Sequence, residues 1–168
     1  MIVGHGDIAS ALTDRHDLVY FASGVSNSQE TREAEYQREI ELLHKQNPRL
    51  HLVYFSSLCV FHSDTRYARH KRTMEKLVSY LFSPYTIVRI GNITWGRNPC
   101  TLINYIRNRI RNRLPIDVQN VYRYIVVKEE FTHWMDMIPS WSCEMNNNRQ
   151  ADACHRHRKR ILLSMGEI

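Results

Sequence analysis

The sequence predicts a three-layer α/β fold in which helices cover a mostly parallel sheet of about five strands. Short apolar runs alternate four times with segments of helical periodicity, an order that is typical of parallel sheets wrapped by helices. A glycine turn follows the first apolar run, where the first strand of such a sheet meets its helix. The length of 168 residues fits a single domain.

The composition indicates a globular protein with an affinity for anions. Hydrophobic residues make up 43% of the chain and charged residues 24%, and the formal net charge is +6. This charge favours nucleic acids, diphosphates and nucleotide cofactors equally. No apolar run approaches the roughly 18 residues of a membrane span, and the N-terminus lacks the pattern of a secretory signal. We therefore expect a cytoplasmic protein without membrane contact, whose four scattered cysteines are reduced.

Residues 1–12 predict a very short strand, a glycine turn and the start of a helix. The segment Gly4-His-Gly6-Asp-Ile-Ala9 has the G-x-G-x-x-G/A spacing of a dinucleotide-binding turn. Its glycines allow a tight turn and a close approach of the backbone to a pyrophosphate, which then lies at a helix N-terminus.

The next two predicted elements are a buried strand and a helix, joined by a polar loop. Residues 17–22 are apolar throughout after the first position, which is typical of a strand buried in a parallel sheet, and a polar loop follows them at residues 23–28. A helix is expected from Ser28, its cap, to about residue 46, before Pro48. Its sparse apolar positions fit a solvated helix packed along one stripe, or alternatively a partner helix in a dimer.

The strongest chemical pattern lies between residues 52 and 71. A strand over residues 50–56 delivers Ser57, and a helix over residues 65–82 carries Tyr67 and Lys71 on one face, one turn apart. A fixed ammonium favours ionisation of a nearby phenol, and a serine hydroxyl can orient a carbonyl or alcohol. The three residues suit proton transfer beside a hydride acceptor, although a Tyr-x-x-x-Lys spacing also arises by chance on amphipathic helices.

The second half predicts a fourth strand at residues 85–90, a helix at 101–113, a strand at 121–127 and a helix at 129–137. Arginines recur around the helix at 101–113, and we favour a solvated basic face over nucleic-acid binding because no pattern of interleaved aromatic residues supports base stacking. Residues 139–168 read as an atypical basic tail or short helix. Its cysteines and histidines match no zinc spacing, so we expect no metal site.

Six segments follow one another along the chain in the order expected of one known family: GHGDIA, DLVYFASGVS, VYFSSLCVF, YARHK, VRIGNITWG and YRYIVVKEEF. Together they resemble the extended short-chain dehydrogenase/reductase family, and within it the NAD-dependent epimerase/dehydratase group that acts on nucleotide sugars. The resemblance covers residues 1–138. It implies a shortened, Rossmann-like NAD(P)-binding domain there and an oxidoreductase or isomerase acting on a nucleotide sugar.

The resemblance also implies a role for each matching residue. Ser57 would orient the sugar, Tyr67 would act as catalytic base or acid, and Lys71 would hold the nicotinamide ribose and lower the pKa of the phenol. Asn92 would face the sugar, and Arg123 would grip the substrate diphosphate. Besides Tyr67 and Lys71, the cofactor-binding positions would be Gly4, Gly6, Asp7, Ile8, Ala9, Ala22 and Ser23.

The chain departs from the family pattern near its start. Residues 13–17 leave no room for the two strands and helices that complete the adenosine pocket in the family, so the residue that distinguishes NAD from NADP is missing. Two alternatives therefore stand beside the enzyme: a catalytically degraded relative that serves as a binding or assembly module, and a basic nucleic-acid-binding protein. The family pairing also predicts a homodimer through the helices at 28–46 and 65–82.

Overall fold

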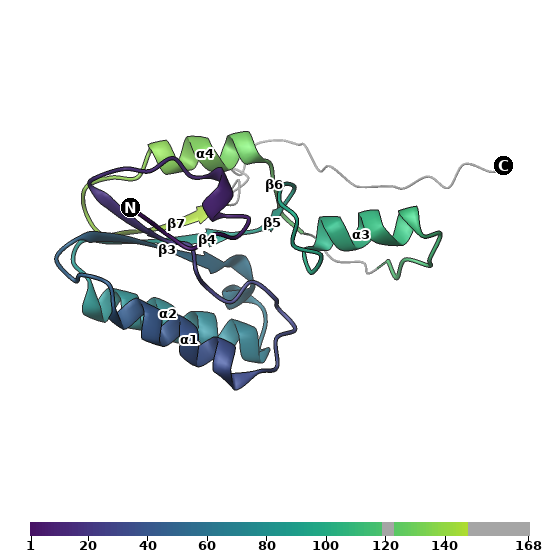
Figure 1. Cartoon of the computed structure of the whole chain (residues 1–168), viewed down its shortest axis with the longest axis horizontal. Helices are drawn as coiled ribbons and strands as arrows, with labels where there is room; N and C mark the ends of the chain where they lie inside the picture. Colours follow the sequence, from purple (N-terminus) through teal and green to yellow (C-terminus); the bar gives the residue numbers. More distant parts are fainter. Residues whose placement is uncertain (119–122, 148–168) are drawn as a thin grey trace.

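A five-stranded parallel sheet forms the centre of the computed structural model, which describes residues 1–118 and 123–147 (Figure 1). The strands lie side by side in chain order, and every neighbouring pair is parallel. They are β1 (Ile2–Val3), β2 (Leu18–Phe21), β3 (His51–Ser57), β4 (Tyr85–Ile90) and β7 (Cys143–Asn147). The predicted mostly parallel α/β architecture is therefore confirmed.

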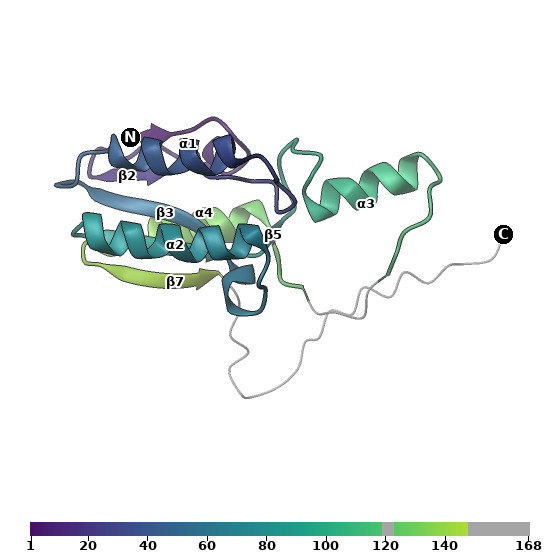
Figure 2. The same cartoon turned by 90° about the horizontal axis from the view of Figure 1, so that it is seen from below.

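Helices cover both faces of this sheet (Figures 1 and 2). The long helices α1 (Glu33–His44) and α2 (Arg66–Leu81) lie on one face, and α4 (Lys128–Asp136) lies on the other with the short 3-10 turn η1 (Ala9–Ala11). A second 3-10 turn, η2 (Leu58–Phe61), leads from β3 towards α2.

A smaller unit projects from one end of the sheet. The strands β5 (Asn92–Ile93) and β6 (Ile125–Val126) pair with each other, and α3 (Leu102–Arg111) stands apart from the sheet and its covering helices in both views. No residue of α3 is buried. Within the described ranges, no helix has the length and apolar character needed to cross a bilayer.

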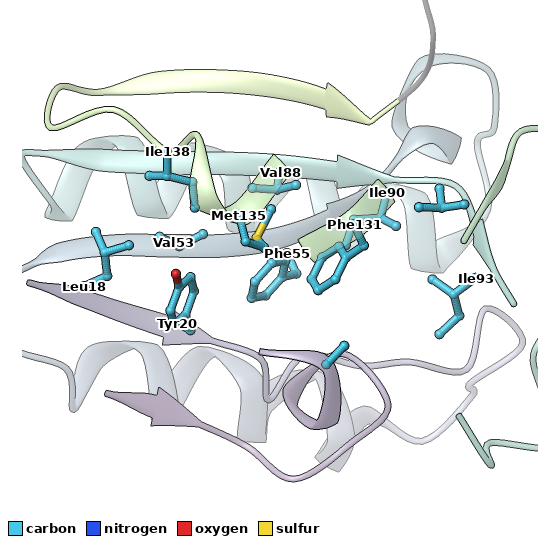
Figure 3. Packing of buried hydrophobic residues seen from close by; sticks show 12 residues of the cluster. Leu18, Tyr20, Val53, Phe55, Val88, Ile90, Ile93, Phe131, Met135 and Ile138 are labelled. Atoms are coloured by element: carbon cyan, nitrogen blue, oxygen red, sulfur yellow. The ribbon is translucent and has the colours of Figure 1, made fainter. Parts of the chain in front are cut away.

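Each face of the sheet has its own apolar core, because the central strands are buried on both sides. One core packs strand residues against α4, where the ring of Phe131 lies 5.9 Å from that of Phe55 (Figure 3). The other core packs Leu52 and Ile87 against Met74 and other residues of the α1 and α2 side. The two cores fix the strand ends that carry the predicted site residues.

Three predicted elements differ from those observed. The turn at Gly6 leads into a three-residue 3-10 turn instead of a helix, because a polar segment ends it before β2 begins. The helix expected from Ser28 begins at Glu33 after Arg32, without a side-chain cap. Of the strand expected at 121–127, only Ile125–Val126 forms, and residues 121–122 lie outside the described residues.

The segment predicted as a tail begins inside the sheet. Residues 143–147 form the edge strand β7, which pairs with β4 from Thr86↔Cys143 to Ile90↔Asn147. The sequence of β7 lacks the apolar alternation typical of a strand. Backbone pairing with β4 and the ion pair of 2.7 Å between Arg89 and Glu144 hold it in the sheet instead. The prediction of a tail is therefore wrong for residues 143–147, while residues 148–168 lie outside the described part.

Candidate active site

The carboxyl ends of the parallel strands gather the predicted site residues at one edge of the sheet. The glycine turn follows β1, Ala22 and Ser23 follow β2, Ser57 ends β3, and Asn92 comes two residues after β4. Ligands of open α/β sheets bind at this edge, because the connections beyond the strands are free to adapt to them.

The two glycines of the first turn do different work. Gly4 has a φ of +124°, and a Cβ at this position would lie 2.5 Å from the carbonyl oxygen of Ala22. Gly4 therefore lets the chain pass closely over the end of β2, where Ala22 donates its backbone N–H to Val3 at 2.8 Å. A Cβ at Gly6 would meet no atom within 4 Å, so only this glycine opens onto free space.

A hollow of about 570 Å³ lies over this turn, lined by His5, Gly6, Asp7, Ser10, Gly96 and Arg97. The exposed guanidinium of Arg97 lies at its wall. Ile8 packs against the core and Ala9 is buried, so these two predicted positions can offer a ligand only their backbone. A three-residue 3-10 turn supplies little helix dipole, which leaves Arg97 as the main positive group for a diphosphate.

Asp7 fastens the glycine turn to the loop beyond β5. Its carboxylate accepts the backbone N–H groups of Arg97 at 2.9 Å and Asn98 at 3.0 Å, and its carbonyl accepts the indole N–H of Trp95 at 2.9 Å. Gly96 has a φ of +93°, and a Cβ there would lie 2.0 Å from Cγ of Asp7. The side chain of Asp7 thus anchors a loop at the rim of the hollow.

Ser57 and Tyr67 meet at the end of β3. The hydroxyl of Ser57 accepts the backbone N–H of Cys59 at 3.3 Å, and the Ser57 side chain lies close enough to the phenol of Tyr67 to affect its pKa. Burial raises the pKa of Tyr67, the nearby Cys59 and Glu39 raise it further, and Ser57 opposes them. The net shift is upward, which corrects the prediction that the phenol ionises easily.

The positive charge of Lys71 is paired with groups other than Tyr67. Its side chain is 2% exposed, and Nζ lies 5.8 Å from the ring centroid of Tyr67. The ammonium donates to Glu39 at 3.1 Å, to the hydroxyl of Tyr54 at 3.0 Å and to the carbonyl of Phe55 at 3.4 Å. The serine, tyrosine and lysine are therefore brought together, with the lysine in a buried ion pair.

The remaining predicted residues lie around this centre. Ser23 accepts a hydrogen bond of 3.3 Å from Arg38, beside the end of β2. Asn92 is half-buried, and its backbone and side-chain N–H groups both donate to the carbonyl of Tyr124. Arg123 is exposed and comes two residues before β6. Asn92 and Arg123 thus belong to the β5–β6 unit.

Comparison with known proteins identifies the fold. The enzyme WbmG of Bordetella bronchiseptica, solved in complex with NAD, matches with a TM-score of 0.55 at 14% identity over 77% of this chain. The fold is Rossmann-like. WbmG in complex with NAD and UDP gives the same TM-score, and the capsular polysaccharide assembling protein CapF of Staphylococcus aureus gives 0.51 at 14% identity.

These likenesses are structural and partial. The chain spans 49% of the WbmG chain in its NAD complex and 39% of the CapF chain. No protein-family profile matches the sequence, and no curated protein matches it either. The comparison therefore establishes the fold, while the adenosine side of the site and the shortening of the family pattern stay predictions.

Sequence reasoning missed Cys59 and Glu39, among other residues of the site. Cys59 follows Ser57 by two positions, and its thiol lies close enough to affect the phenol of Tyr67. Glu39 is completely buried beneath the site. It shares the buried stripe of α1 with Tyr36 and Leu43, so a charged residue at helical spacing within an apolar stripe was the available signal.

Proposed function

We propose that this chain binds NAD(P) over its glycine turn and transforms a nucleotide sugar through Ser57, Tyr67 and Lys71. The observation that carries the proposal is that Ser57, at the carboxyl end of β3, lies close to Tyr67, while the glycine turn with its hollow follows the carboxyl end of β1 in the same sheet. Lys71 lies beneath the ring of Tyr67. WbmG, whose fold the chain shares, binds NAD and UDP in its crystal structures, which supports this class of ligand.

The residues around the hollow fit the diphosphate of a dinucleotide. Gly6 leaves room for the ligand to approach the backbone, and Arg97 supplies a guanidinium suited to phosphate oxygens. When bound, the nicotinamide supplies the hydride acceptor. The preference for NAD or NADP depends on the adenosine side, where β1 is the last described strand of the sheet.

Tyr67 holds its proton at neutral pH, since a free tyrosine ionises only near pH ~10 and burial raises the pKa of Tyr67 further. In this state the phenol can donate a proton or a hydrogen bond to a sugar oxygen, and the Ser57 hydroxyl beside it can orient the same oxygen. Asn92 and Arg123 would contact the sugar and the substrate diphosphate from the β5–β6 unit. Since its phenol starts protonated, Tyr67 would act first as an acid, by donating its proton to the sugar.

Turnover on a panel of nucleotide sugars tests the proposal. Enzyme with bound NAD should show absorbance of reduced nicotinamide or release an altered sugar, and Tyr67→Phe should lower this rate by about 10²- to 10⁴-fold. Tyr80→Phe is the matched control, because Tyr80 lies on the same helix and is 86% exposed. Equal rates for Tyr67→Phe and wild type would contradict the catalytic role.

A second function is favoured by the state of Lys71. An ammonium that is 2% exposed and paired with Glu39 fits a chain that keeps the cofactor fold as a binding or assembly module. Such a module would retain NAD(P) binding and would show no Tyr67-dependent turnover on any nucleotide sugar. The panel therefore separates the two functions directly.

A further inference from the structure

Glu39 is a buried charge that is bonded to four different residues. One carboxylate oxygen accepts from the hydroxyl of Tyr54 at 2.7 Å and from Lys71 at 3.1 Å. The other accepts from the backbone N–H of Val25 at 2.7 Å and bonds to Nε2 of His70 at 3.0 Å. Through these bonds one side chain of α1 holds β3, α2 and the loop that follows β2.

The charge on Glu39 is stabilised by these partners. Burial by itself would raise the pKa of Glu39, but Lys71, His70, the Val25 N–H and Tyr54 outweigh it and hold the pKa well below its usual range. The other carboxylate buried nearby, Glu75, is occupied by both arms of the Arg89 guanidinium at 2.9 and 2.7 Å. Glu39 is thus the carboxylate that pairs with Lys71.

The loop after β2 packs directly against the ion pair of Glu39 and Lys71. A Cβ at Gly24 would lie 2.7 Å from Nζ of Lys71 and 2.8 Å from Oε1 of Glu39. The backbone at Gly24 therefore lies directly against both charges, while Val25 next to it donates its N–H to Glu39. A side chain at residue 24 would therefore push the loop and the two charged groups apart.

We propose that Glu39 is a positioning residue that locks the Lys71 ammonium beneath the Ser23–Val25 loop, so that the loop, held in place by the ion pair, presents one preformed surface to the nicotinamide ribose. The role towards the ribose rests on the proposed function. The lock itself is a property of the chain alone. Without the carboxylate, Lys71 loses its fixed position and the loop loses its bond at Val25.

Chemical labelling of lysine amines, read by mass spectrometry on the full chain without cofactor, tests the lock. In wild type, Lys71 should react at least roughly tenfold more slowly than the exposed Lys45 and Lys76, because it is buried and its charge is paired. Glu39→Gln should accelerate labelling of Lys71 by about tenfold or more and leave Lys76 unchanged. Glu39→Asp keeps the charge on a shorter side chain, so its labelling rate at Lys71 should lie between those of wild type and Glu39→Gln.

Two further variants keep the test decisive if Glu39→Gln does not fold. Gly24→Ala should accelerate labelling of Lys71 by displacing the loop, whereas Gly6→Ala, which meets no atom within 4 Å, should not. Tyr54→Phe removes one bond to Glu39 and one from Lys71 but keeps the ion pair, so it should act in the same direction with a smaller effect. Fast labelling of Lys71 in wild type, or unchanged labelling in both Glu39→Gln and Gly24→Ala, would overturn the lock.

The role towards the cofactor has a separate readout. Calorimetric titration with NAD should show about tenfold weaker binding for Glu39→Gln than for wild type, with partial recovery in Glu39→Asp. Wild type that does not bind NAD would defeat the proposed function and leave the labelling result standing. Equal NAD affinity for wild type and a folded Glu39→Gln would overturn the positioning role towards the ribose.

Discussion

Burial decides the chemistry of single residues at this site. Tyr67 and Lys71 have the spacing that lets an ammonium ease the ionisation of a phenol, yet the structure pairs Lys71 with Glu39 and raises the pKa of Tyr67. The spacing of residues on a helix indicates which side chains share a face. It does not indicate which of them a buried carboxylate from another helix will neutralise.

The raised pKa of Tyr67 predicts a late phenol titration. Folded protein should keep Tyr67 protonated where an unfolded tyrosine ionises, at about pH 10. The resulting stabilisation is fully present below about pH 10 and is lost as the pH rises through the raised pKa. The ultraviolet titration of wild type minus that of Tyr67→Phe should show a midpoint above 10, and a midpoint below ~10 would contradict the burial effect.

The ion pair of Glu39 and Lys71 predicts a large stability effect. Glu39→Gln should lower the free energy of unfolding by about 3–5 kcal/mol, because it leaves the Lys71 charge buried and unpaired. Adding Lys71→Met should recover part of this loss, so the double variant is less destabilised than the sum of the single ones. Urea denaturation of the four proteins measures this, and strict additivity would argue against the pairing.

The same pair sets a direction for acid stability. Since the pKa of Glu39 is lowered on folding, its contribution is present above the unfolded value of about 4.3 and is lost as the pH falls. The difference in unfolding free energy between wild type and Glu39→Gln should therefore shrink with falling pH.

At the scale of elements, Asp7 joins two segments that are about ninety residues apart in sequence. Asp7→Ala removes the acceptor of the Arg97 and Asn98 amides. Hydrogen exchange at these two amides should accelerate by roughly tenfold or more, while the amides of β3 stay protected. Asp117→Ala, which removes an exposed carboxylate, serves as the control and should leave both amides unchanged. Unchanged exchange in Asp7→Ala would contradict the anchoring role.

The elements differ in how far their sequences predict them. The apolar strands β2, β3 and β4 and the stripe of α2 were predicted within one or two residues, because their burial leaves a periodic pattern. The edge strand β7 was missed because its sequence is polar, and only backbone pairing with β4 makes it a strand. The turn η1 was predicted as a helix because the glycine spacing is that of dinucleotide-binding turns, which lead into a helix. Here too few residues lie between the glycines and β2 to form one.

The candidate site was predicted in the same uneven way. Ser57 and Tyr67 lie close together, and each lies on a strongly patterned element, while their roles stay predictions. Glu39, Gly24 and Cys59 were not predicted, because their roles depend on contacts between elements distant in sequence. Local pattern therefore predicts which residues can meet, and tertiary packing determines their charge state.

At the scale of the whole molecule, the pairing of α1 and α2 with a second copy stays a prediction. Tyr80 is 86% exposed on α2, and an aromatic ring of this exposure suits an interface between copies. Sedimentation at micromolar protein should give a dimer mass for wild type and a monomer mass for Tyr80→Glu. A monomer mass for wild type would refute the homodimer.

Binding of NAD, followed by calorimetry on wild type and Gly6→Val, tests the central claim most directly. Nothing lies within 4 Å of a Cβ at Gly6, so valine there should leave the melting temperature unchanged while its side chain blocks the close approach of a ligand to the backbone of the turn. The account predicts saturable binding to wild type and none to Gly6→Val. Absence of binding to folded wild type, or equal binding to both proteins, would contradict it.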